Sequence, residues 1–451
     1  YAIGGDDGAV GSALATVEAA PLDRFGTLGA WRPLPSVLSL PAARTLAAAQ
    51  VVGRFIYLVG GNSGGAVPVA VATVYRAEVL RPVATDRPEI TEVLLEPNAT
   101  GLGAGEWYYR VAAVMALGDA DNPGGESLPS EVQPMRIPSG LAQPLKVTIT
   151  WTAVAGAAGY NVYRSPTAGL VAGNEQLLAA VGVVTSHTDT GGATVATLPR
   201  QLGDIGLWAT MPPLPVAREG LGLGVGQDPL SASDWYLYAV GGRTSAASYP
   251  LGSERYATTI AADGSQSIPA SWLADASLLA GKERWETAVY TVNENVTTRV
   301  AVGETWLYIG PGKTDAGGFE RAMYAAKVQA GGALSGGWVS IGNINSDRSG
   351  FGYAAAANQL YVFGGTSGAP SQLSRSGQLC GTDRITGLPG PCTPAPGVQN
   401  WNAGITLAPV LPDCATGGRY LMGGTIESAH IFIVGGTTAC GTSTSTESVV
   451  W

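Results

Sequence analysis

Short apolar runs that end on a glycine pair recur along the chain, separated by polar and glycine-rich stretches. Each run carries an aromatic residue three places before the pair. Unbroken apolar runs of about five residues bounded by glycine are typical of strands buried on both faces, because paired glycine permits a backbone exit with positive φ. The six runs occupy residues 1–5, 55–61, 235–242, 306–312, 360–365 and 430–436, the fourth with Pro311-Gly312 in place of the pair.

A tryptophan, an apolar or proline-rich stretch and an arginine lie between successive runs. In three repeats the arginine stands at the same distance before the next aromatic residue, which leaves room for one strand and a turn. The pairs are Trp31 and Arg44, Trp208 and Arg218, Trp272 and Arg284, Trp338 and Arg348, and Trp401 and Arg419. We expect the tryptophans to be structural, each filling an equivalent niche between or along the repeats.

These marks predict four strands for each repeat. In the second repeat we expect an inner strand at residues 45–52, the glycine-pair strand at 55–61, a third strand at 73–80 and a fourth around Trp208. Four-stranded units that recur at intervals of tens of residues are the signature of propeller blades.

The glycine pair, the aromatic residue, the tryptophan and the arginine together resemble the kelch repeat, over about 330 of the 451 residues. The tyrosine that the family has in its third strand is matched at Tyr75, Tyr256 and Tyr324. The resemblance implies an all-β fold, a kelch-type β-propeller of about six four-stranded blades. The first repeat has no inner strand before Tyr1 and the last has no fourth strand, so closing the ring needs residues from outside this segment or a partner chain.

An insertion interrupts the second repeat. The aromatic residues of the second and third runs, Tyr57 and Tyr238, are more than twice as far apart as those of any other successive runs. The excess shows alternating apolar residues, a lone Trp151 and frequent turns, which predict a small β-sandwich. Trp151 followed by residues 159–164 resembles a fibronectin type III domain, and the Tyr-Tyr-Arg-Val segment at 108–111 precedes that tryptophan, which suggests a rearranged strand order. The predicted domains are 1–81 and 201–451 for the propeller and 82–200 for the sandwich.

Composition narrows the function classes. The 64 glycines and 29 prolines argue against a helical bundle, and 25 basic against 34 acidic residues give a net charge of −9. We therefore expect no nucleic-acid partner. No unbroken apolar run is long enough to cross a bilayer, so no membrane-spanning segment is expected.

No catalytic motif is complete, so we expect no catalytic residue and no cofactor. Kelch propellers include copper-radical oxidases, which need two histidines and two tyrosines at one metal, and here His187 falls in the sandwich while His430 begins a strand. Residues 61–65 match a nucleophile elbow but lead into a strand, and residues 310–314 match only the end of a phosphate loop. Both are interpreted as turns.

One turn of the sandwich offers hard oxygen ligands of the kind that calcium takes. The candidate ligands are Asp119, Asp121, Asn122 and Glu126. An ordinary solvated turn is the alternative. No other metal site is expected.

The four cysteines all lie near the C-terminal end of the sequence, without a Cys-x-x-Cys pair. Their even number favours disulfides and an oxidising compartment over free thiols. Cys380 and Cys392 are expected in one loop between the third strand and Trp401, on the same face of the propeller as the inserted sandwich. Cys414 and Cys440 are expected in loops on the opposite face, so we predict the bonds Cys380–Cys392 and Cys414–Cys440.

Together these features predict a non-enzymatic, extracellular structural or adhesive protein that acts through binding or assembly surfaces. A surface layer, a filament or a virion appendage would suit it, at the cell or virion surface. Its partner would be a protein or glycan ligand, or copies of itself. The alternative is a secreted carbohydrate-active enzyme, an oxidase or lyase, with the sandwich as an accessory module. An intracellular kelch adaptor is a third hypothesis, which the cysteine pattern disfavours.

Overall fold

The structure is a computed structural model in which strands joined by turns make up nearly all of the described chain. The helical segments among the described residues are the 3-10 turns η1 (Ser36–Leu38) and η3 (Ala330–Gly332). The all-β prediction is confirmed. The described residues are 1–7, 11–23, 25–65, 69–80, 86–119, 121–170, 172–244, 252–259, 266–267, 271–278, 284, 286–294, 304–314, 318–344, 347–356, 359–367, 376–381, 402–406, 421, 423–427, 430–438, 441–442 and 446–450.

The chain divides into two compact units. Unit 1 comprises Tyr1–Arg32, Leu40–Arg76 and Ala209–Trp451, and unit 2 comprises Pro33–Ser39 and Ala77–Trp208. Unit 2 thus contains the stretch that the sequence assigns to an inserted sandwich, with a short N-terminal segment added.

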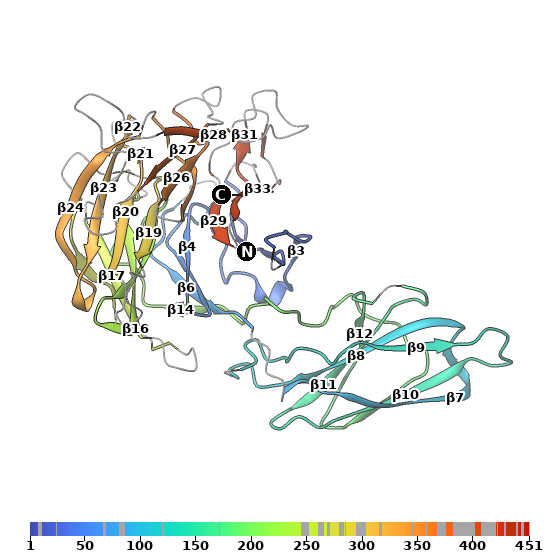
Figure 1. The fold of residues 1–451 in the computed structure, drawn as a ribbon. Coiled ribbons are helices and arrows are strands. Elements are labelled where there is room, and N and C mark those ends of the chain that lie inside the picture. The colour runs from blue at the N-terminus through green and yellow to red at the C-terminus, as the bar shows by residue number, and fades with distance from the viewer. Residues whose placement is uncertain are drawn as a thin grey trace. The chain divides into compact units, whose positions relative to one another are not determined.

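Unit 1 contains four antiparallel sheets of four strands each (Figure 1). The first has the order β14-β6-β5-β4, and the other three follow chain order. Their strands are β4 (Ala48–Val52), β5 (Phe55–Val59), β6 (Val74–Glu78) and β14 (Ala209–Met211); β15 (Gly222–Asp228), β16 (Ser231–Val240), β17 (Ser253–Thr259) and β18 (Leu273–Asp275); β19 (Val289–Glu294), β20 (Glu304–Ile309), β23 (Ala322–Val328) and β24 (Leu334–Asn343); and β25 (Gly352–Ala356), β26 (Gln359–Phe363), β27 (Ser376–Gly381) and β28 (Asn402–Thr406).

Two three-stranded sheets come from the ends of the chain. The N-terminal sheet contains β1 (Ala2–Ile3), β2 (Val17–Ala19) and β3 (Arg32–Pro33), and the C-terminal sheet contains β29 (Gly423–Glu427), β30 (His430–Val434) and β33 (Thr446–Val450). Two short hairpins complete the described strands, β21 (Gly312–Lys313) with β22 (Phe319–Glu320) and β31 (Thr437–Thr438) with β32 (Gly441–Thr442).

The strands of the second repeat agree with the sequence pattern. β4, β5 and β6 lie inside the three predicted stretches, and β14 begins one residue after Trp208. All five side chains of β5 are buried, as expected for an apolar strand covered on both faces.

The sheets of unit 1 pack in chain order through their first strands. β4 contacts β15, β15 contacts β19, β19 contacts β25 and β25 contacts β29. Apolar side chains fill the spaces between neighbouring sheets: Tyr57 and Val59 share one core cluster with Leu223, and Val240 shares another with Val289.

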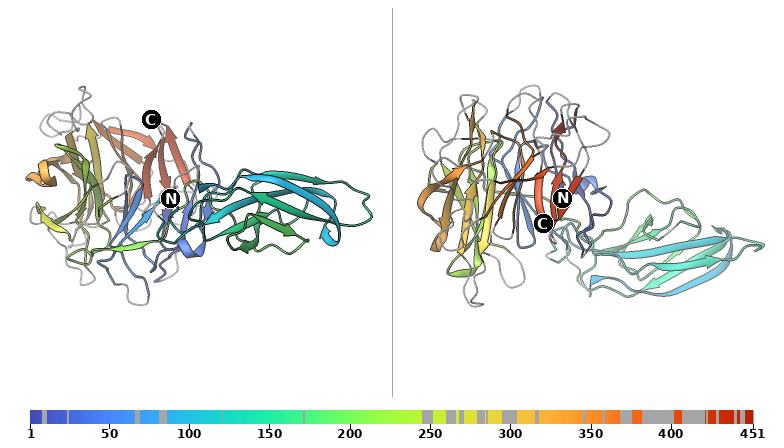
Figure 2. Two further views of the ribbon diagram at one scale, coloured as in Figure 1. Left: turned by 90° about the horizontal axis from the view of Figure 1, so that it is seen from below. Right: turned by 45° about the horizontal axis from the view of Figure 1, so that its top comes forward.

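Unit 2 is built from two sheets that enclose one core (Figure 2). Buried residues from both sheets meet there, among them Tyr109 and Val111 from one sheet and Val147 and Trp151 from the other. The strand orders are β13-β10-β7 and β12-β11-β8-β9, with β7 (Ile90–Leu102), β8 (Gly105–Val114), β9 (Gln133–Ile137), β10 (Leu145–Trp151), β11 (Gly159–Arg164), β12 (Gln176–Val181) and β13 (Ser186–Asp189).

No helix among the described residues is long and apolar enough to cross a membrane.

Candidate binding face

The glycine pairs hold the sheets of unit 1 together. In three of them the second glycine donates its N–H to the carbonyl oxygen of the repeat arginine at the start of the next sheet. The first glycine has a φ near 65°, and a Cβ on it would lie 2.6 Å from the same oxygen. Only glycine fits this position, because both its conformation and its close approach exclude a side chain. The contacts are Gly4 and Gly5 with Arg44, Gly60 and Gly61 with Arg218, and Gly241 and Gly242 with Arg284.

The fourth run departs from this arrangement. Pro311 occupies the place of the first glycine, and Gly312, in the place of the donor, belongs to β21. Gly310 instead donates its N–H to the carbonyl of Ala288 within its own sheet, at 2.8 Å. Pro311-Gly312 therefore marks the same strand end, with a proline where the other runs have their first glycine.

The repeat arginines turn their side chains back into their own sheets. The Nη1 atoms of Arg218, Arg284 and Arg348 donate to carbonyl oxygens at the ends of the glycine-run strands, namely those of Gly241, Gly310 and Gly364, at 2.8 to 3.0 Å. All three arginines are buried. Burial lowers the pKa of Arg348 to about 10. Arg44, also buried, donates to the Tyr75 hydroxyl, which is the predicted third-strand tyrosine, at 3.3 Å.

Two positions after each repeat arginine, the backbone is left-handed. The residues are Leu46, Gly220, Glu286, Gly350 and Leu421, with φ from 48° to 59°. Backbone hydrogen bonds connect several of these residues across neighbouring sheets, from Gly220 N–H to the Leu46 carbonyl, from Gly350 N–H to the Glu286 carbonyl and from Leu421 N–H to the Gly350 carbonyl. We call these five positions the inner belt. It was not predicted, because leucine and glutamate seldom adopt positive φ.

Three of the repeat tryptophans are buried. Trp208, Trp272 and Trp338 are 5 to 9% exposed. Their indole N–H groups donate to the carbonyls of Leu38, Pro212 and Ala276, each of which follows the last strand of the preceding sheet. Trp31 is partly buried. Trp401 and Arg419 lie outside the described residues.

Polar side chains gather where the inner strands begin and the glycine-run strands end. We call this set the glycine-pair cluster. Glu219 accepts hydrogen bonds from Asn62 of the preceding sheet and from Arg243 Nε of its own sheet, the latter at 2.6 Å. Glu286 accepts from Lys313 Nζ of the β21–β22 hairpin at 2.8 Å and from Ser349 Oγ of the following sheet at 2.8 Å. The cluster comprises Asn62, Glu219, Arg243, Glu286, Lys313 and Ser349.

The two glutamates of this cluster, Glu219 and Glu286, make equivalent contacts at different sheets. Each is buried and joins a cation, Arg243 or Lys313, to a polar side chain of a neighbouring sheet. A buried carboxylate is stable only when such partners replace the water it has lost. Their oxygens are therefore engaged in joining the sheets, and the side chains of Arg243 and Lys313 are 32% and 25% exposed.

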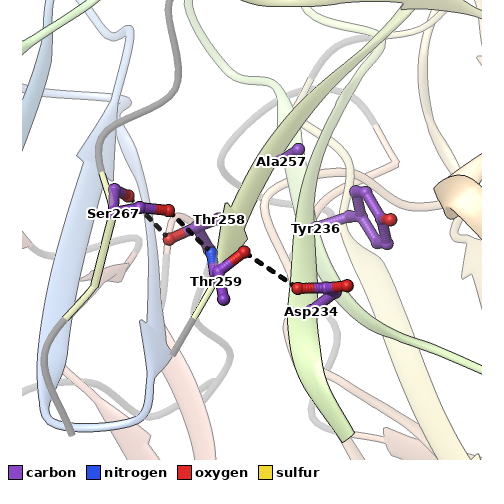
Figure 3. A pocket seen from close by; sticks show the side chains of 6 residues that line it. All are labelled: Asp234, Tyr236, Ala257, Thr258, Thr259 and Ser267. Carbon is purple, nitrogen blue, oxygen red and sulfur yellow. Dashed lines mark hydrogen bonds between the residues drawn. The ribbon is translucent and has the colours of Figure 1, made fainter. Parts of the chain in front are cut away.

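A shallow pocket of about 280 Å³ lies on the sheet of β16 and β17 (Figure 3). Asp234 is its one carboxylate, and it accepts a hydrogen bond from the Thr259 hydroxyl at 2.8 Å. Ser267 receives the backbone N–H of Thr259 and the hydroxyl of Thr258. Burial and a hydrogen bond to Asp228 raise the pKa of Tyr236, which also lines the pocket, to about 12. The arrangement offers hydrogen bonds to a ligand but no second acid or base.

The two histidines belong to different units. His187 is in β13 of unit 2, paired with Ile149, and burial lowers its pKa. His430 begins β30 of unit 1, where its ring stacks on Phe432 with centroids 5.9 Å apart. In the described part of the chain, no three His, Cys, Asp or Glu side chains are grouped so that they could hold a metal ion.

Two of the four calcium candidates, Asp119 and Glu126, accept hydrogen bonds from protein donors. Asp119 Oδ1 accepts the backbone N–H groups of Asp121 and Asn122, at 3.0 and 2.7 Å. Glu126 instead accepts hydrogen bonds from Asn161 and Tyr163, and burial raises its pKa. Asp119 thus stabilises its own turn while Glu126 joins a buried network.

The two motifs interpreted as turns have different structures. Gly64 N–H donates to Asn62 Oδ1 at 2.8 Å, and Asn62 bridges to Thr45 and Ala70 rather than opening a helix. Residues 310–314 contain strand β21, which pairs with β22, so the prediction of a turn at this motif is wrong.

One cysteine position differs from the prediction. Cys380 lies within β27, paired in register with Leu360, and not in the loop that follows the third strand. Cys392, Cys414 and Cys440 lie outside the described residues, so both predicted bonds remain predictions.

Comparisons with known proteins give no family. No protein-family profile and no curated protein matches the chain. Among the solved structures that match, one described as "Structure of YjhT" is 10% identical, covers 91% of this chain and 98% of its own, and has a TM-score of 0.36.

Proposed function

We propose that unit 1 is a kelch-type propeller of six sheets. Five sheets follow one another through their inner strands. The N-terminal sheet contacts the sheets on either side: Leu14 forms a bridge with Arg44, and Gly26 lies against the His430 ring of the C-terminal sheet. These contacts support a ring in which the N-terminal sheet closes the circle.

Unit 2, in this proposal, is a fibronectin type III-like sandwich in which the order of the strands along the chain is rearranged. β8, which carries the Tyr-Tyr-Arg-Val segment, pairs with β11 and β9, and β10, which carries Trp151, pairs with β7 and β13. This agrees with the expectation that the strand order is rearranged, because β8 and β9 precede β10 in the chain.

The whole chain then serves as an extracellular structural or adhesive scaffold, a binding protein rather than an enzyme. The observation that carries this proposal is the use of buried polar groups in unit 1. Glu219 and Glu286 join neighbouring sheets, and Arg218 pairs with Glu254 inside one sheet. Groups fixed in this way give a rigid polar face, and such a face suits a protein or glycan ligand.

Immunogold labelling of the native source tests this role. Antibodies against the full chain should label intact cells or particles at their surface, and negative-stain images of the labelled material should show a repeating assembly. Label that appears only after lysis would contradict the proposal. So would a copper-dependent oxidase or a lyase activity in the purified chain, which would favour the secreted enzyme.

A further inference from the structure

One wall of the pocket on β16 and β17 is fixed by hydrogen bonds to the preceding sheet. Ser267, which lines this wall, donates its backbone N–H to the Thr259 carbonyl at 3.0 Å. Its neighbour Gln266 accepts a hydrogen bond from the Tyr57 hydroxyl of β5 at 2.5 Å and donates to a backbone carbonyl of β4 at 3.1 Å. Thr258 is 3% exposed and donates to the Ser267 carbonyl at 3.2 Å. A ligand would therefore meet a wall that is already ordered, which lowers the cost of binding.

The following sheet covers the aromatic residue of the pocket. Tyr236 is 7% exposed and donates its hydroxyl proton to Asp228 at 3.0 Å. A Cβ on Gly332, in the turn η3 between β23 and β24, would lie 2.5 Å from carbon atoms of the Tyr236 ring. The guanidinium carbon of Arg255 lies 5.9 Å from the centre of the same ring. Protein groups therefore cover this ring, and it offers no open face to a ligand cation.

The polar side chains of the pocket offer both hydrogen-bond acceptors and a donor (Figure 3). Among the described residues, the Asp234 carboxylate receives one side-chain hydrogen bond, from the Thr259 hydroxyl at 2.8 Å, and a carboxylate can accept about four. The Thr259 hydroxyl, having donated its proton, still has lone pairs that can accept. The Ser267 hydroxyl accepts the Thr259 backbone N–H at 3.2 Å and can donate its own proton.

Size and charge select a small neutral ligand. The volume of about 280 Å³ lies just below the range of about 300–1,000 Å³ that is usual for drug-sized ligands, so the pocket suits one ring rather than a long chain. Asp234 is the one charged residue of the lining, which disfavours an anion. Arg255 beside the covered Tyr236 ring disfavours a cation. A sugar ring meets these conditions, because each of its hydroxyl groups both donates and accepts hydrogen bonds.

We propose that this pocket binds one neutral sugar unit, an inference that rests on the proposed role of the chain as a binding protein. One sugar hydroxyl donates to the Asp234 carboxylate and a second accepts from the Ser267 hydroxyl, with Thr259 between them. The methyl group of Ala257 contacts the C–H groups of the ring. No bond of the sugar breaks, because Asp234 is the one carboxylate of the lining and glycoside hydrolysis uses a pair.

Saturation-transfer NMR with the full chain tests this site. The probes are the methyl glycosides of glucose, galactose and mannose, and we expect saturable binding of at least one of them. Methyl glucuronide, an anion, and ethylammonium, a cation, should not bind. Asp234→Asn keeps the size of the side chain and removes its charge. This variant should bind the glycoside about tenfold more weakly, because a charged acceptor forms the stronger hydrogen bond.

Two further variants separate the pocket from the rest of the surface. Ala257→Val adds methyl groups inside the pocket without removing a hydrogen bond, and it should weaken binding to a similar extent. Glu131→Gln, which neutralises an 86% exposed carboxylate of unit 2, is the matched control for Asp234→Asn and should leave binding unchanged. Hydrogen exchange in β16 should be the same in all three variants as in the original chain.

The outcomes distinguish this site from the role of the whole chain. If no neutral glycoside binds, or if binding persists in both Asp234→Asn and Ala257→Val, the sugar site is wrong, whereas surface labelling of the native source still decides the scaffold role. Preference for methyl glucuronide or ethylammonium would also overturn the neutral ligand. Cleavage or oxidation of a glycoside by the purified chain would contradict both the site as proposed and the non-enzymatic role.

Discussion

Replacing Gly241 with alanine tests the contact between glycine pair and arginine. Its φ is 68°, and an added Cβ would lie 2.6 Å from the Arg284 carbonyl oxygen. That oxygen accepts the Gly242 N–H at 2.8 Å, and it belongs to the next sheet. The substitution therefore strains the backbone and separates two sheets.

The expected cost follows from two contributions. Left-handed backbone costs a non-glycine residue about 1–2 kcal/mol, and leaving the buried N–H and carbonyl unpaired costs about 1–3 kcal/mol more. Gly336→Ala is the matched control, because its φ of 64° is similar and nothing lies within 4 Å of the new Cβ. It should lose only the backbone contribution, about 1–2 kcal/mol.

Hydrogen exchange measured by mass spectrometry reports the local stability of individual strands in both variants. Amides of β16 should exchange about 30- to 3,000-fold faster in Gly241→Ala, because about 1.4 kcal/mol corresponds to a factor of ten. β10 of unit 2 serves as the internal reference and should not change. If the two variants accelerate exchange in β16 equally, the steric and hydrogen-bonding role given to the pair is wrong.

Three further outcomes are expected. Trp272→Ala should lower the free energy of unfolding by about 3–5 kcal/mol, as a large-to-small core change, and full stability with lost ligand binding would contradict the structural role. Among the tyrosines that the structure describes, burial raises the pKa of nine. Their protonated forms therefore stabilise the fold below pH 10, and this stability is lost as the pH rises above 10. Tyrosinate absorbance at pH 11 should be lower in the folded chain than in guanidinium, and equal absorbance would refute this. Non-reducing peptide mapping should find Cys380–Cys392 and Cys414–Cys440, and a peptide joining Cys380 to Cys414 or Cys440 would show the pairing to be wrong.

The strands of unit 1 were predictable because their signals are local. In an apolar run such as Phe55–Val59, the apolar residues predict a buried strand, and the adjacent Gly60 and Gly61 predict where that strand ends. An insertion in the second repeat is likewise indicated by the sequence, because the interval from Tyr57 to Tyr238 is too long for a single repeat.

The contacts between sheets could not be read from the sequence. Glu219 meets Asn62 across 157 residues, and only the packing of two sheets brings them together. Leu46 and Leu421 adopt positive φ because the inner belt imposes it, against their local preference. The sequence pattern puts Cys380 in a loop because no local signal shows that the third strand continues to Gly381.

A density map of the purified chain, by cryo-EM or crystallography, would test the proposed ring most directly. We expect six sheets around one axis in unit 1, with the Arg284 carbonyl on Gly241 and Gly242 and the N-terminal sheet between the sheets of β4 and β29. Five or eight sheets, or sheets that do not surround a common axis, would contradict the proposed propeller.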